Sequence, residues 1–331
     1  MNMNDHQRRF PRGVFAMVLA TVLATGACSS SHSSKGGTTG GSADGKAVPP
    51  SSTVAPASVA STPEVLDPNA LSLPIEQYEM TPAQNNAISR AKNELAVQCM
   101  KRFGFTITPP ASGNGTATAF LDRRYGATNA TTAAQWGYHL PNTGGKPSEP
   151  NLDTAQMQVL TGSTDTNRAG TTAAPTTGTP LVVAGQQVPK GGCMAEATEK
   201  LTTAGGTLGE PDIVRQIDHD GYNRSAADPR VTATFAKWSA CMKGKGYSYA
   251  SPIEAENDKD FAGRVASPKE IAVATADVSC KQQTKVVGTW LAVDAAYEKA
   301  EIDVNASTLA GIKQGNDTLL KAADKVLGTS S

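Results

Sequence analysis

Few groups in this chain could carry acid–base chemistry, and the clearest set is Asp218-His219-Asp220-Gly221. Two carboxylates beside an imidazole can bind a cation or tune the pKa of a general base. A calcium loop centred on this glycine would begin at Gln216 and end at Ala227, where calcium binding needs carboxylates. The spacing therefore favours a polar helix end followed by a glycine turn. A hydrolase that uses Asp218 and His219 is the weaker alternative.

A second set mixes cationic, aromatic and imidazole groups within one short stretch of the chain. Its members are Arg123, Arg124, Tyr125, Trp136, Tyr138 and His139. Aromatic rings next to guanidinium groups can stack on a sugar face or contact an anionic polymer. We therefore predict a binding surface here. The alternative is that the rings cover a small helical core while the arginines pair with acidic side chains.

Cys28 has the surroundings of a lipid attachment site. Three arginines in residues 8–12 precede an apolar run over residues 14–23, which is shorter than the roughly 20 residues of a transmembrane helix. The sequence Ala24-Thr25-Gly26-Ala27-Cys28 then resembles the site where bacterial prolipoproteins are cleaved and diacylated, with Thr25 in place of the usual large aliphatic residue. We expect residues 1–27 to be a signal peptide and acyl chains such as palmitate on Cys28 to hold the protein on the extracytoplasmic face of the cell membrane. An ordinary secreted protein is the alternative.

Four further cysteines follow: Cys99, Cys193, Cys241 and Cys280. An even number of cysteines in an exported chain indicates disulfides. Zinc is the competing interpretation, but no pair has C-x-x-C spacing and no histidine lies near any of them in the sequence. We therefore expect two disulfides, no metal and no cofactor.

An internal repeat suggests how these cysteines pair. Cys99-Met100-Lys101-x-x-Gly104-Phe105 matches Cys241-Met242-Lys243-x-x-Gly246-Tyr247, and a proline follows each at the same distance. Upstream, Thr81-Pro82 and Asp228-Pro229 place a capping residue before a proline at the first helical position. Each repeat is thus predicted to be a helix that ends with a cysteine and a glycine cap. Pairing each repeat cysteine with the next one downstream predicts Cys99–Cys193 and Cys241–Cys280.

The predicted elements are mostly helices. The shorter ones cover residues 81–103, 129–136, 152–160, 193–203, 210–219, 229–243 and 252–262. The longest begins at Ser267 and extends to about residue 310 with an interruption at Gly288, and a last helix covers 316–327. Trp238 and Trp290 are predicted core residues. Short strand signals occur at 105–107, 181–183 and 247–249, and the first and last could pair as a small ribbon.

Composition sets the domain plan and excludes some partners. The chain has 331 residues with 30 basic and 30 acidic side chains, so it has no broad attraction for nucleic acid. Residues 28–74 are rich in Ser, Thr, Gly, Ala and Pro, and we expect a disordered tether there. Residues 75–331 are expected to form one domain, mainly α and stapled by disulfides, with long loops, a flexible loop near 162–190 and at most a small two-stranded ribbon.

Several short motifs follow one another in a fixed order. They are Cys-Met-Lys-x-x-Gly-aromatic, Arg123-Arg124-Tyr125-Gly126, Gly137-Tyr138-His139, Pro189-x-Gly191-Gly192-Cys193 and Ala276-Asp277-Val278-x-Cys280. Together they resemble a family of actinobacterial cell-envelope lipoproteins over roughly residues 75–315. The resemblance implies an envelope location and a disulfide pattern, and it implies no catalytic residues.

The expected function follows from the location and from missing motifs. G-x-S-x-G, H-E-x-x-H, P-loop and G-x-G-x-x-G sequences do not occur in the chain. We expect a membrane-anchored lipoprotein that acts as a non-catalytic binding or scaffolding module for a cell-wall glycan or a small solute. The alternative is an accessory subunit of an envelope or transporter protein complex, for which the apolar heptad positions within 268–310 are the supporting pattern.

Overall fold

A computed structural model describes residues 54–59, 62–63, 72–109, 123–141, 152–163 and 181–329. The chain separates into two units, residues 1–48 and 49–331, and every described residue belongs to the second. Cys28 and the predicted signal peptide lie outside the described residues. In the described part, no helix is long and apolar enough to cross a bilayer.

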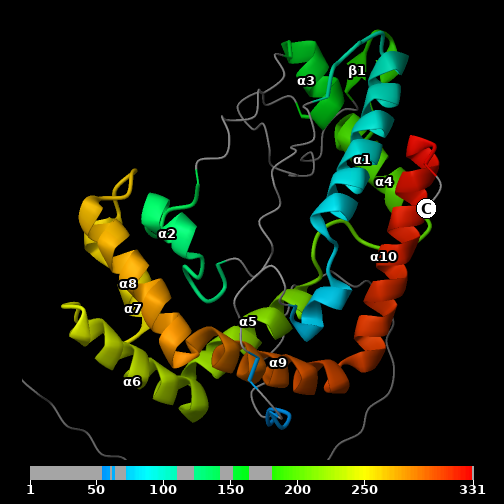
Figure 1. Cartoon of the computed structure of the whole chain (residues 1–331). Helices are drawn as coiled ribbons and strands as arrows, with labels where there is room; N and C mark the ends of the chain where they lie inside the picture. The colour runs from blue at the N-terminus through cyan, green and yellow to red at the C-terminus, as the bar shows by residue number, and fades with distance from the viewer. Residues whose placement is uncertain are drawn as a thin grey trace, which may run out of the picture. The chain divides into compact units, whose positions relative to one another are not determined.

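The described part is mainly helical, as the sequence predicts (Figure 1). Its elements are η2 (Pro74–Tyr78), α1 (Pro82–Arg102), α2 (Ala130–Trp136), α3 (Thr154–Thr161), β1 (Val182–Val183), β2 (Gln186–Gln187), α4 (Gly192–Thr202), α5 (Asp212–Ala227), α6 (Pro229–Gly244), α7 (Pro252–Glu256), η4 (Lys259–Phe261), α8 (Pro268–Thr284), α9 (Val286–Val304) and α10 (Ala306–Leu327).

The two repeats end their helices in the same way. In α1 the amide of Phe105 donates to the carbonyl of Met100 and that of Gly104 to Lys101; in α6 the amides of Tyr247 and Gly246 donate to Met242 and Lys243. Both glycines have positive φ, 80° and 90°. This paired hydrogen bonding is the Schellman cap, which needs a left-handed residue after the last helical turn. The predicted glycine caps are therefore confirmed.

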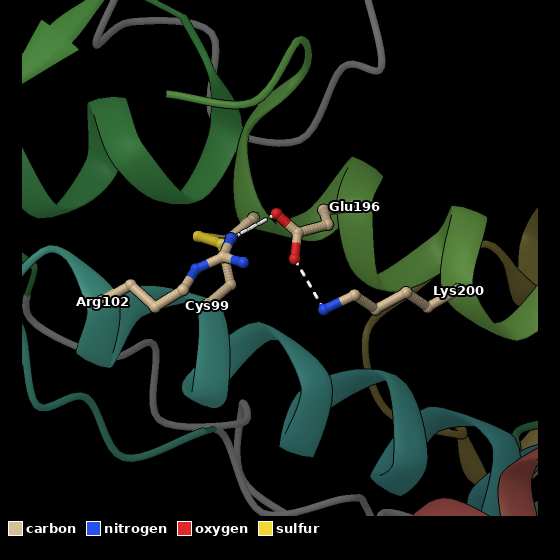
Figure 2. The surroundings of a disulfide bond; sticks show 5 residues. Cys99, Arg102, Glu196 and Lys200 are labelled. Carbon is tan, nitrogen blue, oxygen red and sulfur yellow. Dashed lines mark hydrogen bonds and ion pairs between the residues drawn. A yellow bond between two sulfur atoms is a disulfide. The ribbon is translucent and has the colours of Figure 1, made fainter. Parts of the chain in front are cut away.

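Both predicted disulfides are confirmed. Cys99 bonds Cys193 and joins α1 to α4, with their Cα atoms 5.5 Å apart. Cys241 bonds Cys280 and joins α6 to α8, with a Cα separation of 5.7 Å. Figure 2 shows the Cys99–Cys193 disulfide beside the guanidinium of Arg102. That guanidinium contacts Glu196, and Glu196 also pairs with Lys200 at 2.7 Å.

The helices form two packing groups, each containing one disulfide. In the first group, α1 packs against α4 and α10, and α3 packs against α4 (Figure 1). Its core is built from small and aliphatic side chains such as Ala91, Leu95, Leu201 and Leu319. In the second group, α5 packs against α9, and α6 packs against α8 and α9. The predicted core residues Trp238 and Trp290 are buried there.

Three sequence predictions about element boundaries were wrong. The long helix after Ser267 breaks at Lys285, which has φ 57°, and at Asn305, while Gly288 stays helical and buried inside α9. The helix predicted to end before Gly221 continues to Ala227, because Gly221 lets α5 approach α9 closely.

The third difference concerns the ribbon. Residues 105–107 and 247–249 contain no strand, and the antiparallel pair is the hairpin of β1 and β2, within the predicted 162–190 loop. Ala184 and Gly185 both have positive φ, the arrangement of a two-residue hairpin turn whose twist matches paired strands.

Candidate functional site

Arg124 occupies the centre of a buried cluster of charged groups. Its Nε donates to Asp294 Oδ2 at 2.7 Å and its Nη2 to Asp294 Oδ1 at 3.2 Å, a bidentate pair with α9. Nη1 contacts Asp218 Oδ1 of α5 at 2.5 Å, and Nη2 also reaches the Asp218 carbonyl at 2.9 Å. The side chain is only 8% exposed. Burial opposes its charge, but the hydrogen bond and the charge of Asp294 outweigh that effect and raise the pKa of Arg124.

Tyr125 belongs to the same cluster and to the core. Its hydroxyl donates to Asp294 Oδ2 at 2.8 Å, and its ring lies 5.1 Å from that of Trp290. The indole of Trp290 donates to Ser225 Oγ at 2.9 Å. Tyr125 is 2% exposed, so its ring offers no surface for stacking on a ligand.

Glu298 completes the cluster one helical turn after Asp294. It is fully buried, accepts from the amide of Ile75 at 3.1 Å, and lies 3.5 Å from Arg124 Nη2. Burial and the neighbouring charge of Asp294 raise the pKa of Glu298 to about 9. A protonated Glu298 leaves Asp294 and Asp218 as the carboxylates that pair with Arg124. The cluster fixes the Arg123–Gly126 turn between α5 and α9.

A second buried charge pair lies on α8, beside the same turn. Lys281 Nζ is 2.9 Å from Asp277 Oδ2 and donates to the Ala127 carbonyl at 3.0 Å. Asp277 also accepts from the indole of Trp238 at 2.9 Å. Burial raises the pKa of Asp277 although Lys281 lowers it. Gly126 has φ 75°, and a Cβ there would stand 2.8 Å from Lys281 Nζ, so a side chain at this position would be strained and would displace the lysine head.

His139 joins the segment after α2 to the start of α8. Its Nδ1 is 2.7 Å from Glu270 Oε1, and its Nε2 is 2.7 Å from the carbonyl oxygen of Gly263. Both partners are acceptors, so the ring satisfies both contacts when each nitrogen carries a proton. The Gly263 carbonyl and Glu270 raise the pKa of His139. The Tyr138 amide also donates to Glu270 Oε1, at 2.9 Å.

The remaining predicted binding residues lie near His139 and are partly accessible. Arg123 donates to the His139 carbonyl at 2.9 Å and keeps 23% of its side chain exposed. Tyr138 is half-buried, with its ring 5.8 Å from that of Phe261. Trp136 ends α2 and is half-buried. The structure thus divides the predicted set: Arg124 and Tyr125 are core groups, whereas Arg123, Trp136, Tyr138 and His139 lie at the surface edge.

The Asp218-His219-Asp220 set does not converge on one point. Asp218 turns inward to Arg124, while the His219 side chain is 75% exposed and contacts Asn223. His219 Nδ1 is 3.8 Å from Asp220 Oδ1. Within the described ranges, no three His, Cys, Asp or Glu side chains are grouped in a way that could hold a metal ion.

Sequence reasoning missed the acidic and basic groups on α8 and α9. Asp277 and Lys281, and Asp294 and Glu298, are each spaced four residues apart within otherwise apolar helical stretches. That spacing places each pair on one helix face. Two charged residues four positions apart in an apolar helical stretch were the sequence pattern from which these buried groups could have been predicted.

Comparisons with known proteins give no match: none among family models, none among curated proteins and none among solved structures.

Proposed function

We propose that this chain is an extracytoplasmic protein anchored in the cell membrane by a lipid on Cys28, and that its helical domain binds or scaffolds an envelope component without catalysis. The observation that carries the proposal is the pair of disulfides, Cys99–Cys193 and Cys241–Cys280. Disulfides of this kind persist in oxidising compartments outside the cytoplasm. The arginines, the apolar run and Cys28 at the amino terminus have the pattern of an export signal with a lipid attachment site, which agrees with a location outside the cytoplasm.

The binding role rests on the partly accessible residues beside His139. Trp136 supplies a ring for stacking and Arg123 a planar cation, the two groups that suit a sugar face or an anionic wall polymer. Arg123 is held by a rigid frame, because it donates to the His139 carbonyl and His139 is fixed by Glu270. The main chain of Trp136 is joined to the same frame, since the His139 amide donates to its carbonyl at 2.9 Å. A wall glycan or a small solute is the ligand class that this surface fits.

The anchoring half is tested by fractionating cells that express the full chain or a Cys28→Ser variant. We expect the parent chain in the membrane fraction, with a mature amino-terminal peptide that begins at Cys28 and carries diacyl mass. Cys28→Ser should leave the membrane, and a Ser29→Ala control should remain there. Membrane retention of Cys28→Ser would overturn the proposed anchor.

The binding half is tested by co-sedimentation of the Cys28→Ser chain with insoluble peptidoglycan. We expect Trp136→Ala and Arg123→Ala to reduce the bound fraction, and Arg215→Ala, an exposed residue of α5, to leave it unchanged. Equal binding by all variants would show that these residues do not form the binding surface.

An accessory subunit of an envelope complex is the second candidate, favoured by isolated apolar side chains at the surface. Leu140, Val182, Val265 and Val304 are 60%, 59%, 81% and 66% exposed. Val304 lies seven residues after Tyr297, in the predicted heptad of Trp290 and Tyr297, and is the last residue of α9. Crosslinking in intact envelopes that recovers a defined membrane protein would favour this candidate over a glycan ligand.

A further inference from the structure

Residues 54–59 lie against the folded domain, although their composition predicts an unpacked tether. The amide of Ala57 donates to the Ala296 carbonyl of α9 at 3.0 Å. Arg224 of α5 donates through Nη2 to the carbonyl of Val54. The Val59 side chain packs against the core of the second helical group. Three separate contacts therefore hold this segment across α5 and α9.

The surface that receives the segment is fixed by its own contacts. Arg224 Nη1 pairs with Glu301 Oε1 at 2.8 Å, and Glu301 is 1% exposed. The Arg224 guanidinium also lies 4.5 Å from the ring centre of Tyr297, a cation–π distance. The Tyr297 hydroxyl in turn donates to Asp228 at 3.1 Å. The Arg224 guanidinium is thus held in place by Glu301 and Tyr297, and its Nη2 donates to a peptide carbonyl.

The contacts select a class of occupant. Both hydrogen bonds go to the main chain of the segment, at the carbonyl of Val54 and the amide of Ala57. Pro56 has no amide hydrogen and favours an extended backbone, which suits a segment that offers the Val54 carbonyl and the Ala57 amide to α5 and α9. The side chains between Val54 and Val59 are small. An extended peptide of Val, Ala and Pro residues fits this geometry.

We propose that Arg224, Tyr297 and the Ala296 carbonyl form a peptide-docking surface whose occupant is residues 54–59 of the same chain. The folded domain then begins at Val54 and not near residue 75. This assignment does not depend on lipid attachment. Docking also changes the distance that the domain can reach from the membrane, a consequence that rests on the proposed anchor at Cys28. With residues 54–59 docked, a coil tether over residues 29–53 would span about 25–30 Å, whereas an undocked one over residues 29–72 would span about 33–40 Å. Docking therefore keeps the domain closer to the membrane.

The test is hydrogen exchange on the complete Cys28→Ser chain, which has no lipid, so the result is independent of the anchoring proposal. Because the Ala57 amide is hydrogen-bonded to the Ala296 carbonyl, we expect it to exchange about ten-fold or more slowly than in a coil of the same sequence. Val59→Ser removes the side chain that packs against the core, keeps the Ala57 amide as the probe, and should return that amide toward its coil rate. Ala55→Pro, at an exposed position whose amide makes no hydrogen bond in the described part of the chain, is the matched control and should keep the protection.

A second variant tests the receiving side. Arg224→Ala should remove protection of the Ala57 amide, while Arg215→Ala on the same helix should not. Exchange of the Ala57 amide at its coil rate in the parent chain, or full protection in both Val59→Ser and Arg224→Ala, would overturn the proposal. Protection that falls on dilution would also overturn it, because the segment would then come from a second copy.

Discussion

The two disulfide-bonded helical groups share a local motif and differ in what fills their interiors. Each has a repeat helix, a Schellman cap and a cysteine bonded to a later helix. Among the described residues, the buried acidic and lysine side chains all fall between Asp228 and Glu301, in the second group, and Arg124, whose side chain is 8% exposed, pairs with two of them. In the first group the pairs of Glu196 with Arg102 and Lys200 lie at the surface, where the basic side chains are 50% and 48% exposed.

This difference separates two ways of holding helices together. Apolar packing in the first group needs matching volumes and tolerates a lost ion pair, because exposed pairs contribute about 0–1 kcal/mol. The charged interior of the second group needs each partner, since removing one side of a buried pair leaves a desolvated charge. The shared cap and disulfide therefore specify helix ends and connections, while the core chemistry is set by other residues.

The largest expected effect is the loss of either disulfide. Cys99→Ala with Cys193→Ala opens a 94-residue loop, and Cys241→Ala with Cys280→Ala opens one of 39 residues. The chain-entropy argument gives losses of roughly 4–5 and roughly 4 kcal/mol in the free energy of unfolding. Denaturant titration measures both values. Hydrogen exchange should place the loosening in α1 and α4 for the first variant and in α6 and α8 for the second; the same exchange pattern in both would contradict the division into two groups.

The next effect distinguishes buried from surface charge. Asp294→Ala removes the bidentate partner of Arg124, and we expect a loss of about 3–4 kcal/mol because the buried guanidinium keeps Asp218 at 2.5 Å and Glu298 at 3.5 Å but loses its two best hydrogen bonds to a carboxylate. Arg102→Ala in the first group should cost under about 1 kcal/mol. Thermal or denaturant unfolding measures both.

The control for Asp294→Ala is Asp303→Ala, an exposed acid of the same helix, which should change stability by less than about 0.5 kcal/mol. Equal losses in Asp294→Ala and Arg102→Ala would show that the charged interior is not what stabilises the second group.

The features that the sequence predicted correctly depend on local chemistry. Helix starts at Thr81 and Asp228 and glycine caps at Gly104 and Gly246 follow from residues close together in the chain. The disulfide pairing joins residues 94 and 39 positions apart, and it was predicted from the repeat and from the order of the cysteines. The resemblance to envelope lipoproteins stays a prediction. The helix breaks at Lys285 and Asn305 have no such signal, since neither residue type is a strong helix breaker.

The candidate site was harder to predict because its partners come from distant segments. Arg124 meets Asp294 across 170 residues, and Ala57 meets Ala296 from a segment of low complexity. Whether an arginine is exposed to a ligand or buried by an acid depends on those contacts and not on its neighbours in the sequence. The alternative weighed for this stretch, in which arginines pair with acids, describes Arg124.

Two glycine-to-alanine substitutions compare a closely packed position, Gly221 of α5, with an open position, Gly311 of α10. A Cβ at Gly221 would lie 2.9 Å from Asp294 Oδ1 and 2.9 Å from Glu298 Cγ, so Gly221→Ala should cost about 1–3 kcal/mol. Gly311 has nothing within 4 Å, and Gly311→Ala should stabilise α10 by about 0.5–1 kcal/mol through reduced backbone entropy. Melting temperatures should move in opposite directions. A stabilised Gly221→Ala chain would mean that α5 and α9 can separate without cost.

The smallest expected effect is a pH dependence at His139, in the second group. Because the pKa of His139 is raised above 6.5, protonation favours the folded state; this stability is present below the unfolded pKa and is lost as the pH rises through the folded one. His139→Gln should therefore cost about 0.5–1 kcal/mol at pH 5.5 and less at pH 9. Unfolding at both pH values, with His219→Gln as the exposed control, measures the difference. Gln can replace only one of the two hydrogen bonds with which His139 joins Glu270 to Gly263, and this loss does not depend on pH. An equal loss of stability at the two pH values would therefore show that the ring acts through its shape and not through its charge.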